Sequence, residues 1–326
     1  MRPLFPETKL TKAAKESALR RFWLVELALF FAVFGICMFL QSAVVAPVQT
    51  VAVLREMDLS ALIAENPVDT FTNILAEMNH ILSNLPQFVV WLSLFVTVIN
   101  SIVCLFYCKK IERRSIRSLG FMGTNPVGEY LIGFLVGTIM LALSWALCYA
   151  FGLVESVHLS PTFTLGWFLL FLLGFLIQGL GEEVMCRGYL MLSLSRRYAP
   201  WVCIVVNSVV FMALHLMNPN LSLIALLNLL LFGIFASVYM WKSGSIFGVA
   251  AVHSAWNFVQ GNVFGAEVSG MRMGPSLFAT TFAENGSWLH GGAFGLEGGL
   301  AVTIVTVLAI LIALFLPVKR TALLED

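Results

Sequence analysis

Apolar runs recur along almost the whole length of this 326-residue chain, and most of them are long enough to cross a membrane as a helix. About 20 apolar residues in helical conformation span the hydrocarbon core of a bilayer. The runs are bounded by charged, proline or turn residues and lie at about 22–48, 86–107, 127–151, 163–192, 201–217, 221–241, 246–260 and 299–317. We therefore predict an all-α fold, a polytopic bundle of about eight transmembrane helices.

The composition excludes an ordinary soluble domain. Hydrophobic residues make up 59% of the chain and charged residues 11%, and the mean hydropathy is +0.90, whereas soluble domains have about 45–50% apolar and about 25% charged residues. The formal net charge of +1 leaves no basic excess to neutralise phosphates, so we expect no nucleic-acid partner. The expected surroundings are the lipid bilayer, and the sequence gives no basis for an oligomeric state.

The basic residues predict the orientation, because loops rich in Lys and Arg stay in the cytoplasm. With the N-terminus inside, eight crossings place every basic residue except Arg55, Arg187 and Arg272 on the cytoplasmic side. The loop at about 49–85 is instead acidic, with Glu56, Asp58, Glu65, Asp69 and Glu77. We expect a cytoplasmic segment at 1–21, a single transmembrane domain at 22–317 and a cytoplasmic tail at 318–326.

Cysteine and glycine patterns add two expectations. The six cysteines fall in the predicted spans or at their inner ends and form no CxxC or Cys/His cluster, so they are expected to be apolar fillers and not ligands of a structural zinc. The segment at about 261–298 holds nine glycines, which predicts a compact outer lid or a reentrant segment.

Three short segments place ionisable groups inside apolar runs, where an unpaired charge costs several kcal/mol. The first runs from Gly181 to Gly188 and contains Glu182, Glu183 and Arg187; the second is Phe211 to His215; the third is His253 to Asn257. At about 1.5 Å per helical residue, Glu182, His215, His253 and Asn257 fall at similar depth, near the midplane. We therefore expect one shared site, with tilted or broken helices.

Helical spacing orients these groups. Glu183 and Arg187 are four residues apart and share a helix face, so a salt bridge would lower the cost of burying both. Glu182 lies about 100° further round the helix and is left free to point elsewhere. His253 and Asn257 are also four apart and would aim an imidazole and an amide at the same place.

Such a set suits hydrolysis of a peptide bond. A carboxylate and a neutral imidazole can jointly take a proton from water, a task that fits Glu182 and His215. The oxyanion formed when water attacks a carbonyl needs donors already aimed at it, and His253 and Asn257 would supply two. The chain offers no serine or cysteine with an obvious base partner for this task.

The three segments, in this order on separate helices, resemble the motifs of the CPBP family of intramembrane endopeptidases over about residues 163–260. That family comprises CAAX proteases and bacteriocin-processing or self-immunity proteins, and it includes the eukaryotic type II CAAX prenyl endopeptidase. The resemblance implies that Glu182 and His215 activate water, that His253 and Asn257 form the oxyanion hole, and that Glu183 and Arg187 support them. No cofactor is expected, although one Glu with two His also suits a divalent metal such as zinc, so metal use stays open.

Other readings of the same residues remain. His253 and Asn257 could be an interhelical hydrogen-bonding pair, and Gln178 is interpreted as an interhelical hydrogen bond. The leading hypothesis is a peptidase acting on a peptide or membrane-protein substrate; the alternatives are a non-catalytic membrane scaffold or regulator, including bacteriocin self-immunity, and a proton-coupled transporter. A compact polytopic chain without organellar signals favours the bacterial cytoplasmic membrane.

Overall fold

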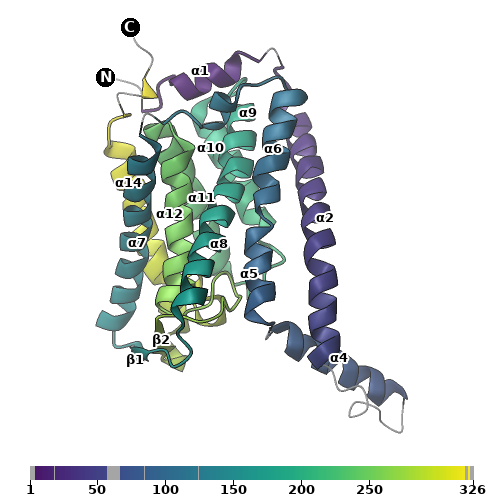
Figure 1. The fold of residues 1–326 in the computed structure, drawn as a ribbon. Coiled ribbons are helices and arrows are strands. Elements are labelled where there is room, and N and C mark those ends of the chain that lie inside the picture. The colour runs from purple at the N-terminus through teal and green to yellow at the C-terminus, as the bar shows by residue number, and fades with distance from the viewer. Residues whose placement is uncertain are drawn as a thin grey trace.

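A computed structural model describes residues 4–17, 19–56, 67–83, 85–123, 125–319 and 322–323. Most of these residues lie in helices that run side by side in one bundle (Figure 1). The α-helices are α1 (Lys9–Lys15), α2 (Trp23–Glu56), α4 (Pro67–Ser83), α5 (Gln87–Phe95), α6 (Val98–Lys110), α7 (Pro126–Ala150), α8 (Leu165–Glu183), α9 (Leu192–Leu194), α10 (Pro200–Leu214), α11 (Leu223–Ser243), α12 (Ile246–Phe258), α13 (Ser287–His290) and α14 (Leu300–Phe315).

Each predicted apolar run is helical in the structure, so the prediction of a helical multi-pass membrane protein is confirmed. By length and composition, five helical stretches of the described chain could cross a membrane: Trp23–Glu56, Gln87–Lys110, Pro126–Ala150, Leu165–Leu194 and Leu223–Ser243. The apolar helices α10 and α14 are shorter. Helix α12 is also short, and all of its residues except Phe247 are buried.

The structure adds two features that the sequence does not predict. The fold is not purely helical, because β1 (Val154–Leu159) pairs antiparallel with β2 (Phe278–Phe282) at the end of the bundle away from the termini (Figure 1). The segment at 49–85 is not simply a loop, since α2 continues to Glu56 and α4 follows. The acidic residues Asp58 and Glu65 lie outside the described residues.

Glycines allow α7 and α12 to pack closely. Gly133 and Gly137 are four residues apart on α7, and a Cβ atom at either position would overlap the backbone oxygen of Gly248 or Val252 on α12. Small residues at this spacing let transmembrane helices approach until their backbones touch. The close approach holds the buried helix α12, which carries the third motif, against the rest of the bundle.

The two ends of the chain lie at the same end of the bundle (Figure 1). Residues Thr8 and Leu323 form an isolated β-bridge there, and α1 lies across the helix ends. A buried ionic cluster, which we name the basic-end cluster, is found at this end and consists of Arg21, Glu26, Glu112, Arg114 and Arg196. It links α2, the segment after α6, and the segment after α9.

Candidate active site

The first motif lies where the helix geometry changes. Glu182 and Glu183 end α8, and Arg187 lies in the π-helical segment Val184–Met191 that continues the same rod. A second π-helical segment, Val259–Val263, directly follows α12 and the third motif. π-Helical turns widen a helix locally and occur often at functional sites. Both helices continue through these π-helical segments and are not broken there.

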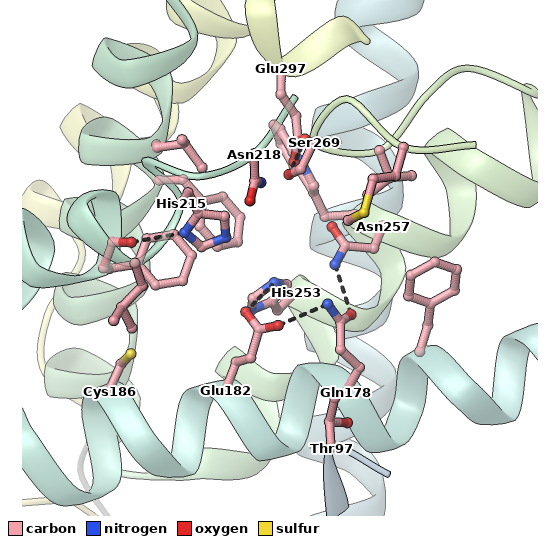
Figure 2. A pocket seen from close by; sticks show the side chains of 18 of the residues that line it. Thr97, Gln178, Glu182, Cys186, His215, Asn218, His253, Asn257, Ser269 and Glu297 are labelled. Carbon is pink, nitrogen blue, oxygen red and sulfur yellow. Dashed lines mark hydrogen bonds and ion pairs between the residues drawn. The ribbon is translucent and has the colours of Figure 1, made fainter. Parts of the chain in front are cut away.

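The polar ends of the motifs face a cavity of about 260 Å³ inside the bundle (Figure 2). Its wall is mostly apolar, with Phe175, Phe211, Phe232, Trp256 and several Met and Leu side chains. The polar side chains that line it are Gln41, Thr97, Asn100, Gln178, Glu182, His215, Asn218, Asn228, His253, Asn257, Ser269 and Glu297. Of the predicted site residues, Glu182, His215, His253 and Asn257 therefore share one cavity.

The other two predicted residues form the layer behind this cavity. Arg187 donates to the Oε1 atom of Glu183 at 2.8 Å, as the four-residue spacing predicts, and both side chains are fully buried. The same Oε1 atom is 2.8 Å from Nδ1 of His253. The guanidinium of Arg187 also lies 4.4 Å from the centre of the Phe211 ring and donates to the backbone oxygen of Gly233. Glu183 thus orients His253, and Arg187 balances the charge of Glu183.

His215 is held at the end of α10 with one nitrogen in use. Its Nδ1 atom is 2.8 Å from the backbone oxygen of Phe211. A carbonyl oxygen only accepts, so Nδ1 carries the proton and donates this hydrogen bond. In the neutral ring the Nε2 atom is then an unprotonated acceptor, which is the form that a general base requires.

Gln178 connects the two remaining site residues. Its amide nitrogen donates to Oε1 of Glu182 at 2.8 Å, and its amide oxygen accepts from Nδ2 of Asn257 at 2.9 Å (Figure 2). The second carboxylate oxygen of Glu182 lies 3.7 Å from Nε2 of His253, which is too long for a direct hydrogen bond. Glu182 faces the other motifs across the cavity, with a quarter of its side chain exposed.

One comparison with known proteins finds a match that covers this part of the chain. Residues 164–259 match the family model described as type II CAAX prenyl endopeptidase Rce1-like. This part of the chain is similar to that family of CAAX proteases. The matched residues, which we call the CPBP domain, contain all three motifs and extend from the residue before α8 to the residue after α12. No curated protein and no solved structure matches the chain.

The CPBP domain does not close the cavity alone, because the glycine-rich segment at 261–298 forms a further part of the wall. Val268, Ser269, Met271, Met273 and Glu297 from this segment line the cavity. Its residues include the strand β2, the short helix α13 and three short 3₁₀ turns. The segment thus packs against the bundle as part of the cavity wall.

Glu297 fastens that wall to α12. Its carboxylate accepts from Nε1 of Trp256 at 2.8 Å, and from the backbone nitrogen and hydroxyl of Ser269 at 2.8 and 2.9 Å. Asn228 of α11 donates to the backbone oxygens of Glu297 and Gly299. These contacts explain how a glycine-rich segment keeps a defined shape beside the cavity.

Sequence reasoning missed Gln178 and Glu297 as parts of the site. The interhelical hydrogen bond expected of Gln178 exists, to Asn257, but the second bond to Glu182 was not foreseen. Its position four residues before Glu182 was the available signal, since such residues share a helix face. Glu297 carries no comparable signal, because its partners come from a loop and from a different helix.

The described part of the chain does not bring enough candidate ligands together to form a metal site. No group of three or more His, Cys, Asp or Glu side chains lies close enough there to hold one. Within the cavity, Glu182 and His253 lie near each other, while Nδ1 of both histidines is already engaged. The Nε2 atoms and Glu182 would be the groups to bind a metal if one entered.

Proposed function

We propose that this protein is an intramembrane endopeptidase that hydrolyses a peptide bond with water activated by Glu182 and His215. The observation that carries the proposal is that the polar groups of three separate helices, Glu182, His215 and the pair His253 and Asn257, line one cavity within the bundle. The family of the CPBP domain is a protease family, which supports a peptidase over the other classes of function.

Glu182 and His215 each keep an atom that can accept a proton from water. Glu182 has one oxygen held by Gln178 and the other turned toward the cavity, and His215 presents an unprotonated Nε2. A water molecule between them would lose a proton to this pair as its oxygen bonds to the carbonyl carbon of the substrate. When the carbon–nitrogen bond of the tetrahedral intermediate breaks, the same proton passes to the leaving amine.

The oxyanion would be stabilised from α12. One N–H of the Asn257 amide is used by Gln178, so the other is available for a developing negative charge. His253 donates through Nδ1 to Glu183, and to donate through Nε2 as well the ring must carry both protons. The carboxylates of Glu182 and Glu183 lie on either side of the ring and would balance that charge.

The topology that fits this proposal places the end of the bundle with both termini in the cytoplasm. Its basic residues include the cluster from Lys109 to Arg117 together with Arg196, Arg197, Lys242 and Lys319, and such residues favour retention inside. The bacterial cytoplasmic membrane is the proposed location, and a peptide or membrane-protein tail is the proposed substrate class.

The test is cleavage of a quenched fluorescent peptide library by the purified protein in detergent. We would compare the wild type with Glu182→Gln, His215→Ala and a control, Glu155→Gln, whose side chain is exposed on β1 and does not line the cavity. Loss of general acid–base catalysis typically lowers the rate by about 10²–10⁴-fold, so cleavage is expected to fall by this factor in the two site variants and to persist in the control. Full activity in Glu182→Gln would refute the mechanism.

A chelator arm separates the proposed mechanism from metal catalysis. Activity that survives chelation supports a glutamate-activated water, whereas activity lost to the chelator and restored by zinc would make Glu182, His215 and His253 metal ligands. If no peptide is cleaved and the biological effect survives Glu182→Gln, the chain acts as a scaffold or regulator.

A further inference from the structure

Residues 109–117, which we call the surface loop, comprise the last residues of α6 and the turn after it, at the end of the bundle where both termini lie (Figure 1). Four basic residues of this loop are exposed, and none of them forms an ion pair with another described residue: Lys109, Lys110, Arg113 and Arg117. Its one acidic residue, Glu112, is buried and bonded to arginines of the basic-end cluster. The charge that the loop presents to its surroundings is therefore positive.

Two exposed isoleucines, Ile111 and Ile116, lie among these cations. The residues between them alternate in burial, since Glu112 and Arg114 are buried and Arg113 is exposed. Basic residues interleaved with apolar ones are typical of segments that lie at the boundary between lipid headgroups and acyl chains. The surface loop has the composition of such an interfacial segment.

Exposed tryptophans place this end of the bundle at the surface of a membrane. Trp23 is the first residue of α2 and Trp201 lies in the first turn of α10, and both are exposed. Tryptophan side chains gather at the level of the headgroups in membrane proteins. Helices α2 and α10 begin at the end of the bundle where α6 ends (Figure 1), so the surface loop lies close to headgroup level.

The backbone holds Arg113 outward at an energetic cost. Its φ angle of 54° lies in the left-handed region, which residues other than glycine, asparagine and aspartate rarely adopt. This turn lets the neighbours Glu112 and Arg114 both point inward, where they pair at 3.1 Å. A glycine would make the same turn without strain. Because strained residues cluster at functional sites, an arginine here indicates that its charge has a role at the surface.

Arg114 connects the surface loop to the layer behind the active site. Its guanidinium donates to the backbone oxygens of Gly188 and Tyr189, which lie in the π-helical segment directly after Arg187. A Cβ atom at Gly188 would lie 2.9 Å from the backbone oxygen of Leu119, so this segment also touches the chain just beyond the loop. A contact that holds the surface loop in place therefore also supports the segment that carries Arg187.

We propose that the surface loop binds anionic phospholipid headgroups, with its four cations on phosphate groups and its two isoleucines at the acyl boundary. Lys and Arg are the side chains that pair with phosphate oxygens, and on the topology proposed above the loop faces the cytoplasmic leaflet, whose anionic lipids attract such clusters. An acidic protein could also pair with the cations, but the exposed isoleucines and the headgroup level favour lipid. The site lies outside the CPBP domain and does not depend on peptidase activity.

The test measures thermal unfolding of the purified full-length protein in a neutral detergent with added phosphatidylglycerol or, as the control lipid, phosphatidylcholine. A ligand that binds the folded state raises the unfolding temperature, so we expect a rise with phosphatidylglycerol that shrinks as the salt concentration increases. Each cation contributes about fivefold to binding at an anionic surface. In the double variant Lys110→Gln with Arg117→Gln, the half-maximal rise should therefore require about 25-fold more phosphatidylglycerol.

The matched control is Arg55→Gln with Arg272→Gln, which removes two exposed cations at the end of α2 and in the glycine-rich segment. This control should respond to phosphatidylglycerol as the wild type does. If the double variant of the surface loop also responds as the wild type does, the inference fails. If the wild type responds equally to both lipids, the positive surface faces water or an acidic protein, and the inference fails as well.

Arg113→Gly separates the charge of the loop from its fold. Glycine adopts the left-handed conformation without strain, so in phosphatidylcholine this variant should unfold at the same or a higher temperature than the wild type. It should nevertheless gain less from phosphatidylglycerol, with about a fivefold higher lipid requirement, whereas Arg113→Lys keeps the charge and should keep the response. An undiminished response of Arg113→Gly would contradict the role assigned to Arg113. Since no measurement here uses peptide cleavage, failure of this inference is distinct from failure of the proposed function.

Discussion

Two buried ionic clusters lie in the same bundle, and they differ in what surrounds them. The basic-end cluster has three arginines around two carboxylates: Glu112 is 2.6 Å from Arg21 and 3.1 Å from both Arg114 and Arg196, and Arg196 is 2.7 Å from Glu26. None of its members lines the cavity. In the cluster of Glu182, Glu183, Arg187 and His253, by contrast, one carboxylate and one imidazole face the cavity.

The difference shows that burial of charge does not by itself mark an active site. In the basic-end cluster each carboxylate has at least one arginine within 3.1 Å, so its charges serve to join distant segments. In the site, Glu183 is matched by Arg187 and His253, but Glu182 and Nε2 of His215 keep atoms available for a reactant. Polar atoms that stay available beside a cavity therefore distinguish a candidate catalytic cluster from one that only joins segments of the fold.

The largest effect is expected from Arg187→Met, which leaves Glu183 buried without its cation. Removal of one partner of a buried pair costs about 3–5 kcal/mol, and His253 also loses its fixed orientation. We expect both a lower free energy of unfolding, measured by thermal or denaturant unfolding in detergent, and loss of peptide cleavage. The double variant Glu183→Leu with Arg187→Met should regain stability and not activity; recovery of both would contradict the role assigned to Glu183.

Arg196→Met tests the other side of the comparison. This arginine bonds to Glu26 and Glu112, both buried, so the cost should approach that of Arg187→Met, about 3 kcal/mol. Because Arg21 and Arg114 remain near Glu112, we expect Arg196→Met to lose less unfolding free energy than Arg187→Met. The kcat of the folded fraction should stay within about twofold of the wild type, since the cluster lies outside the cavity. A kcat reduced to the level of Arg187→Met would end the distinction between the clusters.

Acid pH should weaken the basic-end cluster through Glu112. Burial raises the pKa of this carboxyl, but Arg114 and Arg196 outweigh burial and hold the pKa below the ordinary value of 4.5. A lowered pKa in the folded state stabilises the fold at pH values above the unfolded pKa, and this stability is lost as the pH falls through the folded value. The free energy of unfolding should therefore fall below about pH 4.5, and Glu112→Gln, less stable at neutral pH, should show a flatter acid limb.

The sequence predicts which residues meet at the cavity better than it predicts the contacts that hold them in place. Glu183 and Arg187 pair as their four-residue spacing indicates, and charged residues inside apolar runs mark the helices that meet at the cavity. The bond between Arg196 and Glu26 joins residues 170 positions apart, and Glu297 reaches Trp256 from a loop. Such contacts depend on how helices and loops pack, so no local periodicity indicates them. The sheet of β1 and β2 escapes prediction for the same reason, because its strands are more than 100 residues apart.

The smallest effect is expected at Gln178, whose side-chain amide is hydrogen-bonded to both Glu182 and Asn257 and orients them. Gln178→Leu removes both hydrogen bonds without a change of charge, and the two site residues gain freedom to turn. We expect kcat to fall about tenfold, which corresponds to about 1.4 kcal/mol, with little change in KM. Gln41→Leu is the matched control, because Gln41 lines the same cavity from α2 but bonds to Asn100. Gln178→Glu replaces the amide donor by a second carboxylate that repels Glu182, and we expect kcat to fall further than in Gln178→Leu. A kcat in Gln178→Glu equal to that of the wild type would contradict the role assigned to Gln178.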